Sequence, residues 1–400
     1  MVDSAYWWAF VVLSPLVYWQ LPRGIRAGVL SVASFALLLT FAPADMAALA
    51  ALAGLVYVAH GLPEGGTGAM GWVARLGRSS LPLWLVIGYF VWSKYLPSLL
   101  LALGHQASFL DLAIPLGISY FTFKLLHYSI ERGRDRLPAH GFADFASYMF
   151  LPQIFSAGPI ERFDHYMDNR APDFEWHFVR EGLLRIAQGL VMKFVIAASL
   201  SSVVDRLAGG HYAMLAANVA EIEIWRIWAT LFLDLAYTYF DFAGYSAIAI
   251  GSARLLGLRI MENFNLPFLA TSLQNFWQRW HMTLASWVLA YVYMPIVGAT
   301  RNPYLAIIAA FFVVGIWHAA WPLHWVIWGL WHGIGLAVLI WWTRLFQKRR
   351  SQFLKRGWVK ATGWAMTMVY VALGDVFPAF YTRGPLSDPV AVLGAAFGIR

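Results

Sequence analysis

Two histidines are the residues of this sequence best suited to chemistry, because both lie in strongly apolar surroundings. His281 ends the segment Asn275-Phe-Trp-Gln-Arg-Trp-His281, and His318 ends Gly315-Ile-Trp-His318. A side chain that gains or loses a proton near neutral pH is costly to place in hydrocarbon, so an intramembrane histidine indicates a functional site. An imidazole, with its ordinary pKa of about 6.5, suits a general base. His318 would take a proton from a substrate hydroxyl while that oxygen attacks an acyl carbonyl.

Each histidine also has a structural interpretation that the sequence leaves open. His318 can be hydrogen-bonded within a helix interface, and the tryptophans around His281 can anchor a helix at the membrane surface. The functional interpretation is supported by Trp317 and Trp321, whose side chains would exclude water and limit hydrolysis of an acyl donor. His332, which is followed by a glycine, is a weaker candidate, and we expect it to permit close helix packing.

Other polar side chains in the second half of the chain can surround these histidines. On a helix, Asp234, Asp241 and Tyr245 share one face because they are spaced seven and four residues apart, so they can line one cavity. An alternative is that Asp241 pairs with an arginine such as Arg279 and only locks helices together. Arg279 lies in an aromatic and basic cluster, where it can contact lipid headgroups or an anionic donor.

These residues must be held by helices, since the composition is that of a polytopic membrane protein. Of 400 residues, 60% are hydrophobic and 12% are charged, which is about half the charge content of an average soluble protein. Roughly 17 to 25 apolar residues cross the hydrocarbon layer, so we expect about ten to twelve membrane segments in one all-α domain over 1–400. The predicted spans are 6–22, 27–44, 46–60, 81–103, 112–130, 182–204, 222–250, 303–321, 323–343 and 361–380, with 143–160 and 274–296 partly embedded.

Two intervals depart from this pattern of apolar spans. In 143–160, Pro152 and the pair Gly158-Pro159 free backbone groups that lipid cannot satisfy, so this stretch must be covered by protein or line a wet cavity. We interpret it as a re-entrant segment or as a loop packed against neighbouring helices. The longest polar interval, 161–181, predicts a cytoplasmic segment with an interfacial helix.

The net charge of +8 indicates membrane topology rather than a nucleic-acid partner, because the basic residues gather in short loops. Under the positive-inside rule these loops are cytoplasmic, and the N-terminus, with only Asp3, lies outside. The first apolar run has no basic region before it, so we expect no cleavable signal peptide. The basic loops contain Arg23 and Arg26, Arg75 and Arg78, Arg132 with Arg134 and Arg136, and a group from Arg344 to Lys360.

Several chemistries are excluded or disfavoured by what the sequence lacks. With no cysteine, acyl transfer through an enzyme thioester, disulfides and thiolate metal sites are impossible. No helix carries a His-x-x-x-His or carboxylate-rich spacing, and no phosphate-binding loop or Gly-x-Ser-x-Gly elbow is present. We therefore expect neither a metal nor a tightly bound cofactor.

Considered together, a series of ordered motifs resembles the membrane-bound O-acyltransferase (MBOAT) superfamily between about 112 and 343. Within it, the chain is similar to the bacterial branch that acylates cell-envelope polymers: the D-alanyl transferase of teichoic acids and the alginate and peptidoglycan O-acetyltransferases. Its compact length and its Ser-Ala-Gly-Pro-Ile-Glu-Arg-Phe sequence favour the D-alanyl type. The motifs are Pro115-Leu-Gly-Ile-Ser-Tyr-Phe-Thr-Phe123, Leu151-Pro-Gln-Ile-Phe-Ser-Ala-Gly-Pro-Ile-Glu-Arg-Phe163, Tyr239-Phe-Asp-Phe-Ala-Gly-Tyr-Ser246, Glu262-Asn-Phe-Asn-Leu-Pro-Phe268, Phe276-Trp-Gln-Arg-Trp-His-Met-Thr-Leu284, and Gly315-Ile-Trp-His318 followed by Trp328-Gly-Leu-Trp-His-Gly333.

The resemblance implies a ring of helices around a funnel in the bacterial cytoplasmic membrane. It also implies that His318 matches the essential catalytic histidine of the family and His281 its second functional histidine. The donor would be an acyl-carrier-protein phosphopantetheine thioester or an acyl-CoA in the cytoplasm, and the acceptor a hydroxyl of an extracytoplasmic polymer. A small membrane or extracytoplasmic protein is a further expected partner.

The same resemblance suggests roles for the remaining polar residues. With His281, Arg279 would orient the donor or the acceptor, and Trp317 would line the substrate site beside the catalytic histidine. The three residues Asp241, Tyr245 and Asn265 would hold the histidine-bearing helices or line the acceptor path.

Two departures from the family pattern bear on activity. Ala319 stands where the family usually has glycine after the essential histidine, and Val288-Leu-Ala290 stands where an Arg-Asp pair is frequent. The extra methyl at Ala319 would narrow a channel near His318. Ala319 leaves open a non-catalytic subunit descended from the enzymes. The broken helices and buried carboxylates also leave open a transporter that passes an acyl group or acyl carrier across the bilayer for a separate transferase.

Overall fold

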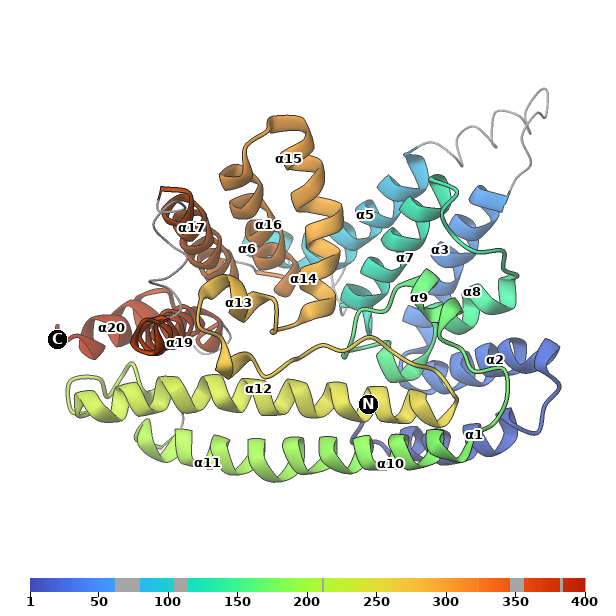
Figure 1. Cartoon of the computed structure of the whole chain (residues 1–400), viewed down its shortest axis with the longest axis horizontal. Coiled ribbons are helices and arrows are strands. Elements are labelled where there is room, and N and C mark those ends of the chain that lie inside the picture. Colours follow the sequence, from blue (N-terminus) through green and yellow to red (C-terminus); the bar gives the residue numbers. More distant parts are fainter. Residues whose placement is uncertain are drawn as a thin grey trace. The chain divides into compact units, whose positions relative to one another are not determined.

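The computed structural model describes residues 1–61, 80–103, 114–210, 212–321, 323–345, 356–381 and 384–399. These residues form helices joined by turns, and the only extended pairing among them is an isolated bridge between Arg170 and Leu258 (Figure 1). The all-α class predicted from the sequence is thus confirmed. Of the basic residues used for the topology prediction, Arg75, Arg78 and those of 346–355 lie outside the described residues.

The chain forms two compact units, each of which takes two stretches of the sequence. The first consists of Met1–Gly189 and Tyr245–Met261, and the second of Leu190–Gly244 and Glu262–Arg400. The single membrane domain and the ring of helices around a funnel stay predictions.

The first unit is built from helices that follow the apolar runs of the N-terminal half. In it, α2 packs on α8, and α5 packs on α7 (Figure 1). The predicted span 81–103 is broken at Tyr95, because Pro97 cannot donate a backbone hydrogen bond and begins a new helix. The helices are α1 (Ala5–Tyr18), α2 (Arg23–Phe41), α3 (Pro43–Gly61), α5 (Leu81–Lys94), α6 (Leu96–Ala102), α7 (Ile118–Gly133), α8 (Phe142–Met149), η2 (Pro152–Ile154), α9 (Phe163–Asp168) and α10 (Trp176–Leu190).

The broken segment 143–160 consists of α8 and a tight turn that is covered by protein. Leu151, Ile154 and Phe155 are buried, and Gly158 has a φ of 100°, which a residue with a side chain rarely adopts. The sequence left open whether this break is covered by protein or lines a wet cavity, and the buried side chains support coverage by protein. The short helix α9 lies within the polar interval 161–181. The cytoplasmic side of this interval and the interfacial position of the helix stay predictions.

The second unit contains the later part of the α10–α11 run, most of α12 and all helices after it. Its elements are η3 (Val191–Ala197), α11 (Ala198–Leu207), η4 (Tyr212–Met214), α12 (Ile224–Leu255), η5 (Pro267–Leu269), α13 (Leu273–Trp277), α14 (Met282–Val288), η6 (Leu289–Tyr293), α15 (Met294–Thr300), α16 (Pro303–His318), α17 (Leu323–Leu345), α19 (Gly357–Ala379) and α20 (Ser387–Ala396). The final residues of α12, from Tyr245, belong to the first unit.

The helices α16 and α17 lie side by side because glycines allow their backbones to approach closely (Figure 1). A Cβ atom on Gly315 would lie 2.4 Å from the carbonyl oxygen of Trp325, and one on Gly329 would lie 2.4 Å from that of Phe311. Small residues at such crossings are typical of membrane helix pairs. This crossing fixes the position of His318 at the end of α16 against the first turns of α17.

By length and composition, five of the described helices can cross a membrane, and three shorter apolar helices accompany them. The five are Arg23–Phe41, Pro43–Gly61, Trp176–Leu207, Met282–Thr300 and Leu323–Leu345, and the shorter ones are Ala5–Tyr18, Leu81–Lys94 and Pro303–His318. The chain is therefore a multi-pass membrane protein. The larger number of about ten to twelve segments stays a prediction.

Candidate active site

His281 lies at the turn into α14, with its backbone in the left-handed region at a φ of 45°. Such a conformation costs on the order of 1–3 kcal/mol in a residue with a side chain, so the surroundings must hold it. Two neighbouring segments do so through backbone hydrogen bonds. The N–H of Met282 donates to the carbonyl oxygen of Asn263 at 2.9 Å, and the N–H of Asn265 donates to that of Arg279 at 2.9 Å.

The imidazole of His281 is only 5% exposed and has a specific hydrogen-bond partner. Its Nδ1 lies 3.2 Å from Oδ1 of Asn263, and the hydroxyl of Thr283 donates to the same oxygen at 2.6 Å. The ring of Phe242 packs edge-on at 4.8 Å between ring centroids. With Nδ1 held on one side of the ring, Nε2 is the nitrogen on the opposite side.

A cavity of about 510 Å³ in the second unit has His281 in its wall. This volume lies within the range of small-molecule sites, which is about 300–1,000 Å³. Apolar side chains from α13, α14, η6, α16 and α17 form most of the wall. A few polar groups could orient a ligand there; they are Gln274, Gln278, His281, Ser286 and Tyr293.

His318 lies in a cage of tryptophans at the C-terminal end of α16. Its ring stacks on Trp325 with 4.0 Å between centroids and an interplanar angle of 15°. Trp317 and Trp328 pack edge-on at 4.7 and 5.7 Å, and both are buried. The described residues that line the 510 Å³ cavity do not include His318. The structure thus places the half-buried ring of His318 among aromatic side chains, and its catalytic role stays a prediction.

Asp241 does not pair with Arg279, so the arginine suggested as an example of its partner is wrong. Arg279 donates instead through Nε to Oδ1 of Asn275 at 3.2 Å and through Nη1 to the carbonyl oxygen of Asn265 at 3.0 Å. Asp241 accepts a hydrogen bond from Nζ of Lys193 at 2.5 Å. The interpretation that Asp241 joins two helices is therefore supported, with a lysine of η3 as its partner.

Tyr245 has its contacts in the first unit, where its hydroxyl lies 3.2 Å from Oγ of Ser156. Its ring also lies close to Gly158 and so packs against the tight turn of the broken segment. Because Asp234 and Asp241 belong to the second unit, a cavity shared by all three residues stays a prediction. Asn265 is exposed, and its backbone contributes to the turn that holds His281.

Asn263 and Thr283 are site residues that the sequence did not single out. Asn263 lies 18 positions before His281, and only the folded turn brings the two side chains together. The sequence feature that could have pointed to them is that Asn263 and Thr283 are polar residues within otherwise apolar and aromatic motifs.

His332, a further histidine of the aromatic region, is fully buried and packs against Trp277, Trp328 and Tyr370. Among the described residues, neither of its ring nitrogens has a hydrogen-bond partner. These contacts support the interpretation that His332 serves close helix packing. The described residues contain no group of three or more His, Asp or Glu side chains that could hold a metal ion.

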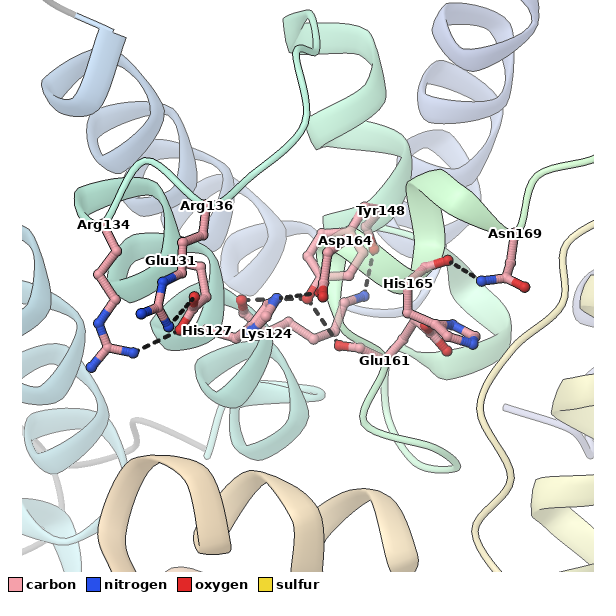
Figure 2. Close-up of polar contacts among 10 residues, drawn as sticks. All are labelled: Lys124, His127, Glu131, Arg134, Arg136, Tyr148, Glu161, Asp164, His165 and Asn169. Atoms are coloured by element: carbon pink, nitrogen blue, oxygen red, sulfur yellow. Dashed lines mark hydrogen bonds and ion pairs between the residues drawn. The ribbon is translucent and has the colours of Figure 1, made fainter. Parts of the chain in front are cut away.

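The first unit contains a buried polar cluster of its own, which we name the Glu161 cluster (Figure 2). Nζ of the buried Lys124 donates to the carbonyl oxygen of Tyr148 at 2.5 Å, and the hydroxyl of Tyr148 donates to the carbonyl oxygen of Glu161 at 2.9 Å. The carboxylate of Glu161, which is 0% exposed, accepts from Nδ1 of His165 at 2.5 Å and from the N–H of Met261 at 2.8 Å. Both carboxylate oxygens are therefore occupied by protein groups.

At the edge of the Glu161 cluster, two titratable groups have altered pKa values. Oδ1 of Asp164 lies 3.2 Å from Nε2 of His127, and this contact is the main reason that the pKa of Asp164 is lowered to about 2. The hydrogen bond to the Glu161 carboxylate raises the pKa of His165 above its ordinary value. The cluster thus anchors α9 and the polar interval to α7.

Residues 83–374 match the family described as MBOAT, membrane-bound O-acyltransferase, and the chain belongs to this family. The predicted resemblance is confirmed. The chain is 34% identical over 268 residues to a probable alginate O-acetylase of Pseudomonas aeruginosa, covering 63% of this chain and 49% of that protein. It is 28% identical over 363 residues to a peptidoglycan O-acetyltransferase of Helicobacter pylori, covering 80% and 65% respectively.

A third relative is a teichoic acid D-alanyltransferase of Bacillus subtilis, which is 29% identical over 277 residues, covering 64% of this chain and 65% of that protein. These relatives are the three kinds of protein that the motifs predicted. The chain spans about half the length of the alginate relatives that it matches.

Proposed function

We propose that the chain is an O-acyltransferase that moves a small acyl group, acetyl or D-alanyl, from a cytoplasmic thioester donor to hydroxyls of an extracytoplasmic cell-envelope polymer. Membership of the family and relatives named for acyl transfer to alginate, peptidoglycan and teichoic acid support the proposal. The structural observation that carries it is His281, which is held by Asn263 in the wall of a ligand-sized apolar cavity.

In the proposed reaction, His318 takes the proton of the acceptor hydroxyl as its oxygen attacks the thioester carbonyl. The tetrahedral intermediate then collapses, the carbon–sulfur bond breaks, and the new ester remains on the polymer while the thiolate takes up a proton. The tryptophans around His318 keep water from competing for the acyl group. His281 orients a substrate group from the cavity wall.

The other predicted site residues serve mainly to hold this arrangement. Arg279 and Asn265 bind each other and keep the turn before α14 closed. Asp241, through Lys193, joins α12 to η3. We therefore propose that these residues act on the histidines through the scaffold rather than by touching substrate.

The proposal also includes the acyl donor, the membrane and a partner protein. The donor is an acyl group on the phosphopantetheine arm of a carrier protein or on coenzyme A, and the membrane is the bacterial cytoplasmic membrane with the N-terminus outside. A small membrane or extracytoplasmic protein assists on the acceptor side. The apolar cavity beside His281 is large enough for part of a donor or acceptor chain.

A transfer assay in detergent tests the proposal and separates it from transport. Purified protein is mixed with labelled acetyl-CoA, acetyl-carrier protein or D-alanyl-carrier protein and with alginate, peptidoglycan fragments or teichoic acid. We expect one donor and acceptor pair to give a polymer-bound ester although no membrane barrier is present. Failure of every pair, together with movement of an acyl group across proteoliposome membranes, would support the transporter instead.

A further inference from the structure

The contact between Asn263 and His281 determines more than the position of the ring. Asn263 is 0% exposed, and its Oδ1 faces two groups, the hydroxyl of Thr283 and Nδ1 of His281. The backbone N–H of Met282 donates to the carbonyl oxygen of the same asparagine. Because the side chain and the backbone of Asn263 are both engaged by residues 281–283, the ring and the amide cannot turn independently.

An amide oxygen can only accept a hydrogen bond, which restricts the protonation state of its partner. Nδ1 of His281 must therefore carry the hydrogen when the two atoms meet at 3.2 Å. A neutral imidazole has a single N–H, so Nε2 is left with its lone pair. Because His281 lies in the wall of the cavity, that lone pair can accept a hydrogen bond from a donor group of a substrate bound there.

We propose that Asn263 is a positioning residue that fixes His281 in the Nδ1-protonated tautomer, so that Nε2 accepts a proton or hydrogen bond from the substrate. The inference rests on the proposed function and adds the chemistry of the bound group. That group is a donor, either the hydroxyl of the acceptor or an amide N–H of the pantetheine arm. The thioester carbonyl, which only accepts, is not the partner of His281.

The test compares Asn263→Leu with Asn263→Asp in the purified protein, using the donor and acceptor pair that the wild type accepts. Leucine removes the acceptor, and loss of the hydrogen-bond partner that orients a metal-bound histidine, a comparable case, costs about 10- to 100-fold. We expect such a fall in kcat with little change in KM. Aspartate keeps a hydrogen-bond acceptor beside Nδ1, so Asn263→Asp should retain most of the wild-type kcat.

The pH profile supplies a result that a merely structural role would not give. A carboxylate at position 263 favours the protonated imidazole, so the acid limb of the profile should move to higher pH in Asn263→Asp. Arg279 is present in both the wild type and Asn263→Asp, so its charge does not contribute to the difference between their pH profiles. Thr283→Val, which removes the second donor to the same oxygen, is the matched control and should lower kcat less than Asn263→Leu.

The outcomes separate this inference from the proposed function. Full activity of His281→Ala would contradict the role given to His281 itself. An inactive His281→Ala combined with a fully active, folded Asn263→Leu would overturn the inference alone. If Asn263→Leu does not accumulate as folded protein, Asn263→Asp serves as the test. The inference would be overturned if the acid limb of its pH profile did not shift, or if it lost as much activity as His281→Ala.

Discussion

The Glu161 cluster of the first unit and the His281 turn of the second are both buried and polar, but their polar groups are used differently. In the Glu161 cluster, both carboxylate oxygens and the lysine are occupied by protein groups. At the His281 turn, one ring nitrogen is held by Asn263, and the residue lies in the wall of a cavity of about 510 Å³. A buried polar residue is therefore a better candidate for ligand binding when it borders a cavity than when protein groups occupy all of its polar atoms.

The largest effect on stability is expected from Glu161→Gln. A glutamine can accept at only one of the two positions, so its NH₂ group would face either His165 or the N–H of Met261. Loss of a hydrogen bond to a charged group costs about 1.5–3 kcal/mol. We expect a lower melting temperature in detergent, with acyl transfer per folded molecule within a few-fold of the wild type.

Glu175→Gln is the matched control for this change, because Glu175 forms an exposed ion pair with His177. Exposed pairs contribute about 0–1 kcal/mol, so the melting temperature should hardly move. A stable Glu161→Gln protein with no transfer activity would remove the distinction between the two regions, since it would give the Glu161 cluster a direct role in the reaction.

The second region should be sensitive to the approach of α16 and α17. Gly315→Ala would place a methyl 2.4 Å from the carbonyl oxygen of Trp325, the residue on which His318 stacks. Overpacking of this kind costs about 1–3 kcal/mol and should also lower transfer by moving the ring. Gly298→Ala, with nothing within 4 Å of its Cβ, is the control. Equal melting temperatures and activities of the two variants would contradict the close crossing.

A smaller effect is expected from pH, through the edge of the Glu161 cluster. The raised pKa of His165 contributes stability that is fully present below its ordinary value of 6.5 and is lost as the pH rises through the raised value. Asp164, with its pKa lowered to about 2, contributes stability above 3.8 that is lost as the pH falls towards 2. The melting temperature should therefore decline above pH 6.5, and less so in His165→Gln. An identical decline in both proteins would argue against this origin.

The smallest effect is expected from Ala319→Gly, which restores the family glycine beside His318. Ala319 has a φ of −137° and a ψ of 150°, an extended conformation that any residue adopts, so glycine is not needed for the backbone there. We expect transfer within about threefold of the wild type, because removing one buried methyl changes packing only slightly. A gain of a hundredfold or more in the same transfer assay would show that the methyl blocks the path to His318.

The sequence predicted the helices well, because a backbone in lipid must satisfy its own hydrogen bonds within helices. Each of the ten predicted spans contains a helix in the structure, although Pro97 divides one of them. Side-chain partners were predicted less well, because they depend on how segments distant in the chain pack. Asp241 pairs with Lys193, 48 residues away on another helix, and not with Arg279. Neither helical periodicity nor spacing contains that information.

The same limit applies to the candidate site. His281 and His318 were singled out by their chemistry in an apolar chain, whereas Asn263 required the folded turn. The cage around His318 was predicted in part: Trp317 contacts the ring, Trp321 is exposed, and Trp325 and Trp328 from α17 complete the cage. Trp325 and Trp328 reach His318 because α16 and α17 cross closely at their glycines. The positions of the tryptophans in the sequence do not predict that crossing.

The most direct test of the central claim is the rate of acyl transfer by purified His318→Ala, compared with His140→Ala. His140 has both ring nitrogens bonded to protein groups, Tyr128 and the carbonyl oxygen of Pro138, and so belongs to the structural class of histidines. Loss of a general base typically lowers the rate by about 10²- to 10⁴-fold. We predict a fall of that size for His318→Ala and transfer near the wild-type rate for folded His140→Ala. Undiminished transfer by His318→Ala would contradict the account.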